Sequence, residues 1–373
     1  MKLKLLTTTA ACTAVLLAGL VAPASAAVPA ATPSGVGVDI ETKSPEEVLA
    51  YWTPERMKRA LAAPERLPSV PAGNVKSERA FAGTSAAEAE HVTASADAVQ
   101  PAAGAASSTL STVSSSVSAQ AAAAADIAVA QDVPASTSIP NVVVGKLFYT
   151  EPDGSPGACS ASVIVSDTAN TIWTAAHCVH LGDGSGDAGW FSNFQFIPGY
   201  KDGQEPWGVW VADREYAPTE WLEEGDSEES DMAAVVLSPS DTYGNIQDNI
   251  GALGYQFGSV TDYDEAFTVG YPGEGYNRTD MDGEQMMYCF GNTEDASSLN
   301  PLDDRLKMDC DMGKGASGGP MFIGALSSNP QIVGANSHYE SDATTDERLD
   351  DDLFSSTHDA NAVAVINAVN DSA

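Results

Sequence analysis

Short apolar stretches separated by turn residues dominate the C-terminal part of the chain. From about residue 138 onward, runs rich in β-branched and aromatic residues alternate with clusters of Gly, Pro, Asn and Asp. The runs lie at residues 141–149, 160–165, 207–212, 232–237, 266–271, 285–290, 305–310, 320–323 and 331–336. Many short strands of this kind predict an all-β domain over residues 138–373, built as an antiparallel sandwich or barrel.

The last residues of the chain follow a different period. Asp359, Ala360, Val363, Ile366 and Val369 are spaced as they would be on a helix. We therefore expect the β domain to end in an amphipathic C-terminal helix.

Two helix starts precede the β domain, within residues 28–81. Ser44-Pro45-Glu46-Glu47 has a capping Ser, a Pro in the first turn and a Glu three residues after the cap. Thr53-Pro54-Glu55 repeats the pattern. We expect two short helices here, although the zone is too small to bury a core of its own.

Residues 82–134 are rich in Ala and Ser and poor in aromatic residues. Such a composition offers little apolar surface to bury, so it predicts a flexible linker without chemistry of its own.

The N-terminus has the layout of a secretory signal peptide. Lys2 and Lys4 precede an apolar run at residues 10–21, and Ala24-Ser25-Ala26 follows as a small-x-small cleavage site. We expect residues 1–26 to be removed and the protein to be secreted, extracellular and free of membrane anchorage, since the run is too short for a span.

The charge balance narrows the possible partners. The chain carries 52 Asp and Glu against 17 Lys and Arg, a formal net charge of −35. Such a surface repels phosphate backbones, so nucleic acid is not an expected partner. The simplest role of the charge is solubility, and steering of basic substrates is secondary.

Four cysteines remain after loss of the signal peptide, which contains Cys12. They are Cys159, Cys178, Cys289 and Cys310. An even number in an exported protein indicates disulfides, and four cysteines allow three pairings. Metal binding would require tight Cys-x-x-Cys or Cys/His clusters, which the sequence lacks.

A glycine-rich serine motif is the strongest candidate for chemistry. In Gly315-Ala316-Ser317-Gly318-Gly319-Pro320, the glycines allow a tight backbone turn that directs N–H groups to one point. A serine nucleophile needs such donors and a neighbouring base. Taken alone, the motif could equally be an ordinary glycine-rich loop.

Two further motifs supply a base and an acid. Thr174-Ala175-Ala176-His177-Cys178 follows a predicted strand end, and Asp231 stands at the head of an apolar strand. A lone His is usually structural and a strand-cap Asp is common. A buried carboxylate that receives the His N–H would instead fix the tautomer needed for catalysis.

The three motifs, in the order His, Asp, Ser, resemble the trypsin/chymotrypsin family of serine peptidases, in particular secreted bacterial members that include the glutamyl endopeptidases. The resemblance covers residues 138–373. It implies two antiparallel six-stranded β-barrels with a C-terminal helix.

The same resemblance implies an endopeptidase with a catalytic triad of His177, Asp231 and Ser317. The amides of Gly315 and Ser317 form the oxyanion hole in this interpretation, an acyl-enzyme is the intermediate, and no cofactor or metal is required. The expected partners are protein or peptide substrates, and the enzyme is expected to act as a monomer.

The two cysteine pairs fit this layout. A Cys159–Cys178 bridge would fasten the loop that carries His177. Cys289 and Cys310 are then expected to form a second bridge beside the substrate pocket.

One departure concerns activation. Digestive members of the family have an Asp immediately before the serine, and it pairs with a newly cut N-terminus, whereas this chain has Ala316. Our hypothesis is that residues 27–137 form a pro-segment, so that the protein is a zymogen cut near residues 138–142.

Substrate preference is left open by the sequence. Asp311 lies six residues before Ser317, where trypsin-like members bind basic residues, but Lys314 could neutralise it. Glutamyl members place a His on the pocket wall, in the strand after the serine. Here Asn336 falls at that position, with Ser337 and His338 beside it. Ser337 could also offer backbone contacts to an extended peptide.

Three other interpretations compete with this one. The first is a secreted binding module on an inactive protease fold, although all three triad residues are present. The second is an α/β-hydrolase esterase, which requires the order Ser, acid, His. The third is a calcium loop beginning at Asp183, but its twelfth residue is Phe194 instead of Glu.

Overall fold

The computed structural model describes residues 35–63, 65, 70–71, 92–96, 126–134, 141–258, 261–296, 305–327, 329–342, 344–345 and 347–373. The chain divides into residues Met1–Ala31 and Thr32–Ala373, and the description below concerns the second unit. The predicted signal peptide and most of the predicted linker lie outside the described residues.

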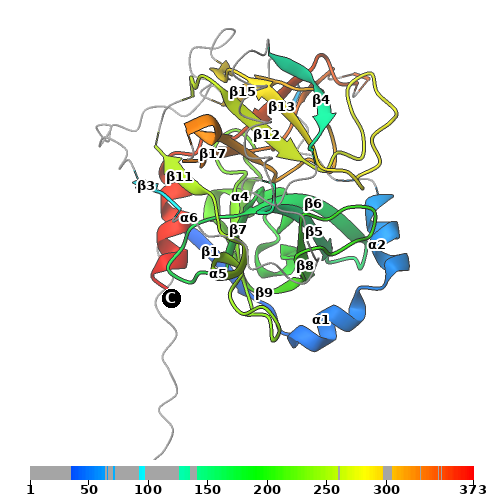
Figure 1. Cartoon of the computed structure of the whole chain (residues 1–373), viewed down its shortest axis with the longest axis vertical. Coiled ribbons are helices and arrows are strands. Elements are labelled where there is room, and N and C mark those ends of the chain that lie inside the picture. Colours follow the sequence, from blue (N-terminus) through cyan, green and yellow to red (C-terminus); the bar gives the residue numbers. More distant parts are fainter. Residues whose placement is uncertain are drawn as a thin grey trace, which may run out of the picture. The chain divides into compact units, whose positions relative to one another are not determined.

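Six antiparallel strands form a closed barrel in the first half of the β domain (Figure 1). The sheet order is β9-β10-β7-β6-β5-β8, and pairing of β8 with β9 closes the barrel. The strands are β5 (Val144–Thr150), β6 (Pro156–Val163), β7 (Thr171–Thr174), β8 (Ser192–Pro198), β9 (Trp210–Pro218) and β10 (Ala233–Leu237). An additional strand, β1 (Val36–Ile40), pairs with β9 over its whole length.

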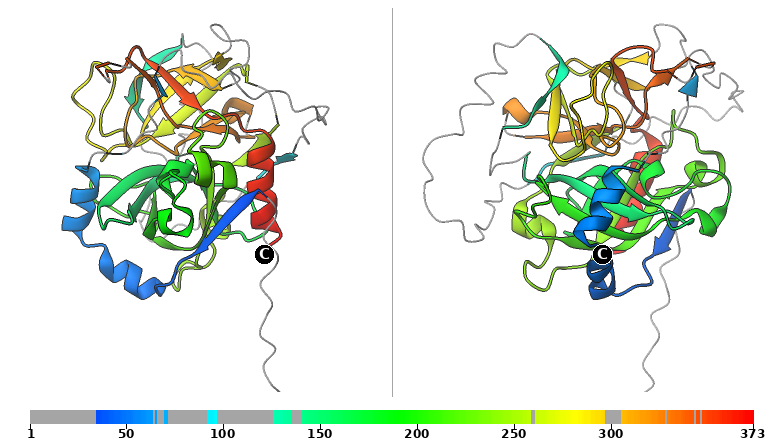
Figure 2. Two further views of the ribbon diagram at one scale, coloured as in Figure 1. Left: turned by 180° about the vertical axis from the view of Figure 1, so that it is seen from behind. Right: turned by 90° about the vertical axis from the view of Figure 1, so that its right-hand side faces the viewer.

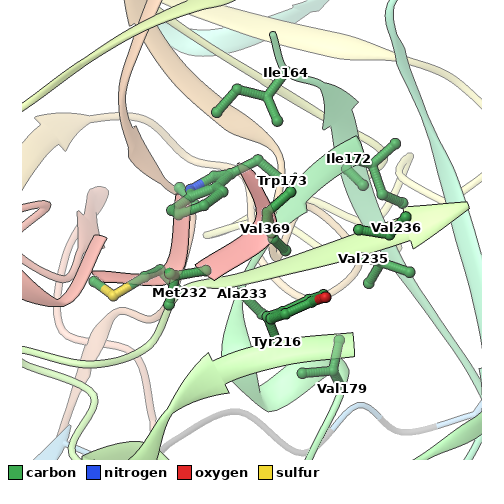
Figure 3. Packing of buried hydrophobic residues seen from close by; sticks show 14 of the residues in the cluster. Ile164, Ile172, Trp173, Val179, Tyr216, Met232, Ala233, Val235, Val236 and Val369 are labelled. Atoms are coloured by element: carbon green, nitrogen blue, oxygen red, sulfur yellow. The ribbon is translucent and has the colours of Figure 1, made fainter. Parts of the chain in front are cut away.

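The core of this barrel is made of strand residues that are buried on both faces, together with the C-terminal helix. Figure 3 shows Ile172 and Trp173 of β7 beside Val235 of β10 and Val369 of α6 (Ala360–Asn370). All five residues of β10, Ala-Ala-Val-Val-Leu, are buried. Small and β-branched side chains suit such a position because they pack closely on a strand.

A second sheet has the order β3-β11-β17-β16-β12-β13-β4. Its members are β3 (Val92–Ala94), β4 (Ile127–Asp132), β11 (Gly254–Phe257), β12 (Ala266–Gly270), β13 (Met287–Gly291), β16 (Pro320–Ile323) and β17 (Gln331–Ala335). Three more strands, β14 (Glu294–Asp295), β15 (Leu306–Asp309) and β19 (Asp352–Ser355), form a small sheet, and β18 (Glu340–Ser341) pairs with β2 (Val70–Pro71). The all-β prediction with a C-terminal helix is confirmed, with the second sheet in place of the second predicted barrel.

Both helices predicted ahead of the β domain are present. They are α1 (Pro45–Tyr51) and α2 (Pro54–Leu61). The Ser44 hydroxyl accepts from the Glu47 N–H while the Glu47 carboxylate accepts from the Ser44 N–H, so the capping box is complete. Thr53 caps α2 through the Arg56 N–H.

The helices pack against the first barrel, as Figure 2 shows from two sides. Trp52 is buried, and its indole N–H donates to the Asn193 carbonyl at 2.6 Å. Its ring centroid lies 5.5 Å from that of Phe148 in β5. Val48 and Met57 are buried in the same cluster. The N-terminal zone therefore has no separate core, as expected, and it shares the core of the β domain.

The linker prediction is wrong for two of its pieces. β3 pairs with β11, and β4 pairs with β13 in the second sheet. β4 also bonds to the segment that follows β15, because the Asp311 N–H donates to the Ala128 carbonyl at 2.9 Å. Neighbouring strands supply these hydrogen bonds, so low apolar content did not prevent strand formation.

The remaining helices in the described part of the chain are short. They are α4 (Thr219–Glu224), α5 (Ile246–Ile250) and the 3₁₀ turns η1 (Ala176–Cys178), η2 (Gly186–Gly189) and η4 (Ala325–Ser327). Among the described residues, no helix has the length and apolarity that a bilayer crossing requires.

Candidate active site

His177 and Asp231 are brought together by strand register. His177 lies in η1, just after β7, and Asp231 lies two residues before β10. β7 and β10 pair with Thr174 opposite Ala233, so both side chains emerge at the same end of the pair. The Asp231 carboxylate accepts from the His177 backbone N–H at 2.9 Å and from its Nδ1 at 2.8 Å.

Asp231 is fully buried and is held by a third donor. The Ser337 hydroxyl donates to Asp231 Oδ2 at 2.5 Å. Burial alone would raise the pKa of Asp231, but the charge and hydrogen bonds of His177, with that of Ser337, hold it below its ordinary value. The carboxylate is therefore ionised at neutral pH.

The imidazole of His177 is fixed in one orientation. Because Nδ1 faces Asp231, that nitrogen carries the proton and Nε2 points away from the carboxylate. Nε2 is buried and makes no hydrogen bond with any described residue, and Oε1 of Glu65 lies 3.5 Å from it. Burial would lower the pKa of His177, yet Asp231 and then Glu65 raise it to about 10.

Ser317 lies in a tight turn against the loop that carries His177. Its carbonyl accepts from the Ser160 N–H at 2.7 Å. Gly318 has a φ of +75°, and a Cβ there would stand 1.9 Å from the Thr174 hydroxyl. Only glycine fits at this position, for both reasons.

Both cysteine pairs form disulfide bridges, and the first of them joins two segments of this arrangement. Cys159 and Cys178 are bonded, with an S–S distance of 2.03 Å, which ties the residue next to Ser160 to the residue next to His177. Cys289 and Cys310 form the second pair, at 2.07 Å. Both pairings agree with the sequence-based expectation. The chain thus gathers the loops of His177 and Ser317 at one place.

The backbone before Ser317 offers amide donors. Gly315, at a φ of +92°, donates its N–H to Oε2 of Glu65 at 2.5 Å. The N–H of Ser317 donates to no described residue. The Ala316 carbonyl accepts from the Asn336 amide at 3.1 Å and from the Gly319 N–H, which holds the turn in shape.

A buried lysine lies behind this turn. Lys146 of β5 is 1% exposed, and its ammonium donates to the Tyr271 carbonyl at 3.1 Å. The Ser160 hydroxyl accepts from the Tyr271 N–H and donates to the Gly315 carbonyl, which links the lysine to the turn. Burial lowers the pKa of Lys146 to about 8, with Glu65 as the largest opposing charge. The sequence analysis did not single out Lys146. The one feature that could have indicated it is its position as a charged residue inside the apolar run 141–149.

The residues expected to line the substrate pocket already form hydrogen bonds or ion pairs within the protein. Asp311 accepts from the Ala130 N–H at 2.8 Å, and its other oxygen lies 3.2 Å from the Arg278 guanidinium. Lys314 pairs with Glu274 at 3.8 Å, so Arg278, and not Lys314, compensates Asp311. Asn336 is buried and accepts from the Thr268 hydroxyl at 2.5 Å.

Ser337 and His338 link Asp231 to the buried Arg305 through a series of hydrogen bonds. The Ser337 hydroxyl lies 2.8 Å from His338 Nδ1, and Arg305 lies 2.8 Å from His338 Nε2. Since the Ser337 proton goes to Asp231, Nδ1 of His338 must donate and Nε2 must accept from Arg305. Burial, together with Arg305, lowers the pKa of His338 to about 3, so the ring is neutral.

Two groups of potential metal ligands occur among the described residues. One contains Glu65, Cys159, His177 and Cys178, and the other contains Cys289, Cys310 and Asp311. The cysteines of both groups are in disulfides and offer no thiolate, so neither group has the donor set of a metal site. Asp183, the first residue of the calcium-loop interpretation, accepts from the Ser185 N–H within its own turn.

Comparison with known proteins identifies the fold through solved structures and not through sequence families. No protein-family model matches the chain, and no curated protein matches its sequence. Among solved structures, the protease Anisep from Arthrobacter nicotinovorans is 27% identical, with a TM-score of 0.54, and the match covers 64% of this chain and 99% of that chain. A thermostable serine protease, AL20, from an extremophilic microorganism is also 27% identical, with a TM-score of 0.51 and coverage of 62% and 96%. This chain therefore has a chymotrypsin-like fold, and these two structures are a protease and a serine protease.

Proposed function

We propose that the protein is a secreted serine endopeptidase with His177, Asp231 and Ser317 as its triad. The observation that carries the proposal is the buried Asp231 carboxylate, which accepts from both the backbone and the ring of His177. This arrangement leaves Nε2 as the nitrogen able to take a proton. The protease-like fold and the glycine turn at Ser317 support the same assignment.

The proposed reaction has two halves. Nε2 of His177 takes the Ser317 hydroxyl proton while Oγ bonds to the peptide carbonyl carbon, and the amides of Gly315 and Ser317 stabilise the oxyanion. The peptide C–N bond then breaks, and the leaving amine takes the proton from His177. Water repeats the sequence on the acyl-enzyme and releases the carboxylate product. The substrates are accordingly proteins or peptides, with no cofactor needed.

Secretion and maturation belong to the same proposal. The signal-like N-terminus and the two disulfides support export to an oxidising compartment. A cut near residue 138 would remove β4, which pairs with β13 and anchors Asp311. The proposed processing site therefore lies within residues 97–125. N-terminal sequencing of the secreted form tests this, and a start at residues 138–142 would contradict it.

The activity test compares the wild-type protein with Ser317→Ala. We expect the secreted wild-type protein to react with a fluorophosphonate probe at Ser317 and to cleave casein. Ser317→Ala should show no labelling and lose at least about a thousandfold in kcat/KM. Ser166→Ala is the matched control and should behave as wild type. Ser166 is also buried, its hydroxyl bonds to that of Thr168, and the bond of its backbone N–H to Gln247 is kept in the variant. A processed wild-type protein that neither labels nor cleaves would favour the binding-module alternative.

A further inference from the structure

A carboxylate of the chain itself occupies the proposed catalytic centre. Glu65 lies four residues after the end of α2, and its side chain is 5% exposed. Its Oε2 accepts the Gly315 N–H, which is one of the two proposed oxyanion donors. Its Oε1 lies 3.5 Å from His177 Nε2 and 3.2 Å from the sulfur of Cys159.

This geometry matches what a cleavage product would adopt. A product carboxylate places one oxygen at the oxyanion donors and the other towards the imidazole. The Glu65 carboxylate takes both places at once. It is a side-chain acid without a leaving amine, so Ser317 has no bond to break. The residue therefore fills the centre without being consumed.

The helices before Glu65 hold it in place. Val48, Trp52, Met57 and Ala60 are buried against the first barrel, and β1 pairs with β9 upstream of them. Leu61 and Glu65 are only four positions apart in the chain, which limits the distance between them to about 13 Å. The anchor and the carboxylate thus act as one module, residues 35–65, with a matching surface on the barrel.

The electrostatics of the site favour the bound carboxylate. His177 is an imidazolium near neutral pH, because Asp231 and Glu65 both stabilise its charge. The ammonium of Lys146 supplies a second positive charge, for which Glu65 is the strongest opposing partner. A protonated His177 cannot take the Ser317 proton, so Glu65 opposes catalysis electrostatically as well as by occupation.

We propose that residues 35–65 are a built-in inhibitory module of the proposed peptidase and that the Glu65 carboxylate is its recognition group at the oxyanion amide of Gly315 and at His177. The inference rests on the proposed function, since it names the regulation of the same site. The module is a partner that the domain carries covalently until processing, and its docking surface includes Phe148 and Asn193.

Fluorophosphonate labelling of the unprocessed chain tests the module. We would compare wild type, Glu65→Gln and Glu65→Ala, with Glu55→Gln as the matched control because Glu55 is exposed in the first turn of α2. We expect Glu65→Gln to label at least tenfold faster than wild type and Glu65→Ala faster still. Glu55→Gln should label like wild type, and all four processed enzymes should label at one rate.

The outcomes separate the two proposals. If the processed enzymes label but unprocessed Glu65→Gln and Glu65→Ala are as slow as wild type, the role of Glu65 is wrong while the peptidase stands. If the processed enzymes do not label, the peptidase proposal fails. A second measurement does not depend on labelling activity. The pH titration of the His177 ring, followed by NMR, should show the imidazolium persisting to a higher pH in the unprocessed wild-type chain than in unprocessed Glu65→Ala. An unchanged His177 titration would also overturn the inference.

Discussion

At the scale of residues, the site is a chain of proton donors that ends at one carboxylate. Arg305, His338, Ser337 and Asp231 follow one another at hydrogen-bond distance, and Asp231 supports His177. The motifs alone suggested His177, Asp231 and Ser317, because each has a local signal in the sequence. The contact of the Ser337 hydroxyl with Asp231 had no such signal, since 106 positions separate them. Sequence reasoning assigned Ser337 to substrate contacts instead.

Replacement of Ser337 tests this chain of contacts. Ser337→Ala removes a hydrogen bond to a charged group, which contributes about 1.5–3 kcal/mol. If that support is expressed in the transition state, kcat of the processed enzyme should fall roughly tenfold to a hundredfold with KM nearly constant. The pH at which activity rises should also shift, since Asp231 would hold its charge less firmly. Steady-state kinetics from pH 5 to 9 provide the measurement, and a change confined to KM would favour a substrate-binding role for Ser337.

At the scale of elements, local sequence signals were enough to predict the helices α1 and α2, whereas several strands depend on partners that are distant in the chain. The capping residues Ser44 and Thr53 were sufficient to predict α1 and α2. In contrast, β3 and β4 came from a stretch whose composition indicated a linker, and their pairing partners lie far away in the chain. β8 and β11 were also missed as strands, because neither was distinguished from the loops around it. Strand formation in this chain depends on long-range pairing, which composition does not encode.

The docking of α1 can be measured by truncating its anchor. Trp52→Ala should destabilise the unprocessed chain by about 3–5 kcal/mol, because it leaves a cavity against Phe148 and removes the bond to Asn193. Leu49→Ala is the control, since Leu49 lies in α1, one turn before the C-cap Trp52, and is 44% exposed. Urea unfolding monitored by near-UV circular dichroism gives both values. Equal losses for the two variants would mean that α1 does not share the barrel core.

At the scale of the whole molecule, a net charge of −35 is combined with a buried cluster of opposite charges. Any Glu→Gln change reduces the overall repulsion, whatever its position. The ion pair of Glu65 with His177 acts in the opposite sense, because its loss removes an attraction inside the protein. The family-like motifs pointed to His177, Asp231 and Ser317 but not to this pair, since Glu65 lies in a stretch without any recognisable motif. The pair emerges only when the helices are placed on the barrel.

The pH dependence of stability distinguishes these two effects. The pKa of His177 is raised from 6.5 to about 10 in the folded chain, so the stabilisation that its charge provides is complete below about pH 6.5 and is lost as the pH rises through about 10. Glu65→Gln should therefore lower the Tm of the unprocessed chain most at pH 6–7, and the difference should shrink towards pH 10. Glu224→Gln, at an exposed site, reports the general charge effect and should leave Tm unchanged or slightly raised across this range. Thermal unfolding of the three proteins at each pH provides the measurement, and a Glu65→Gln effect that stays constant from pH 6 to 10 would show that the imidazolium is not its partner.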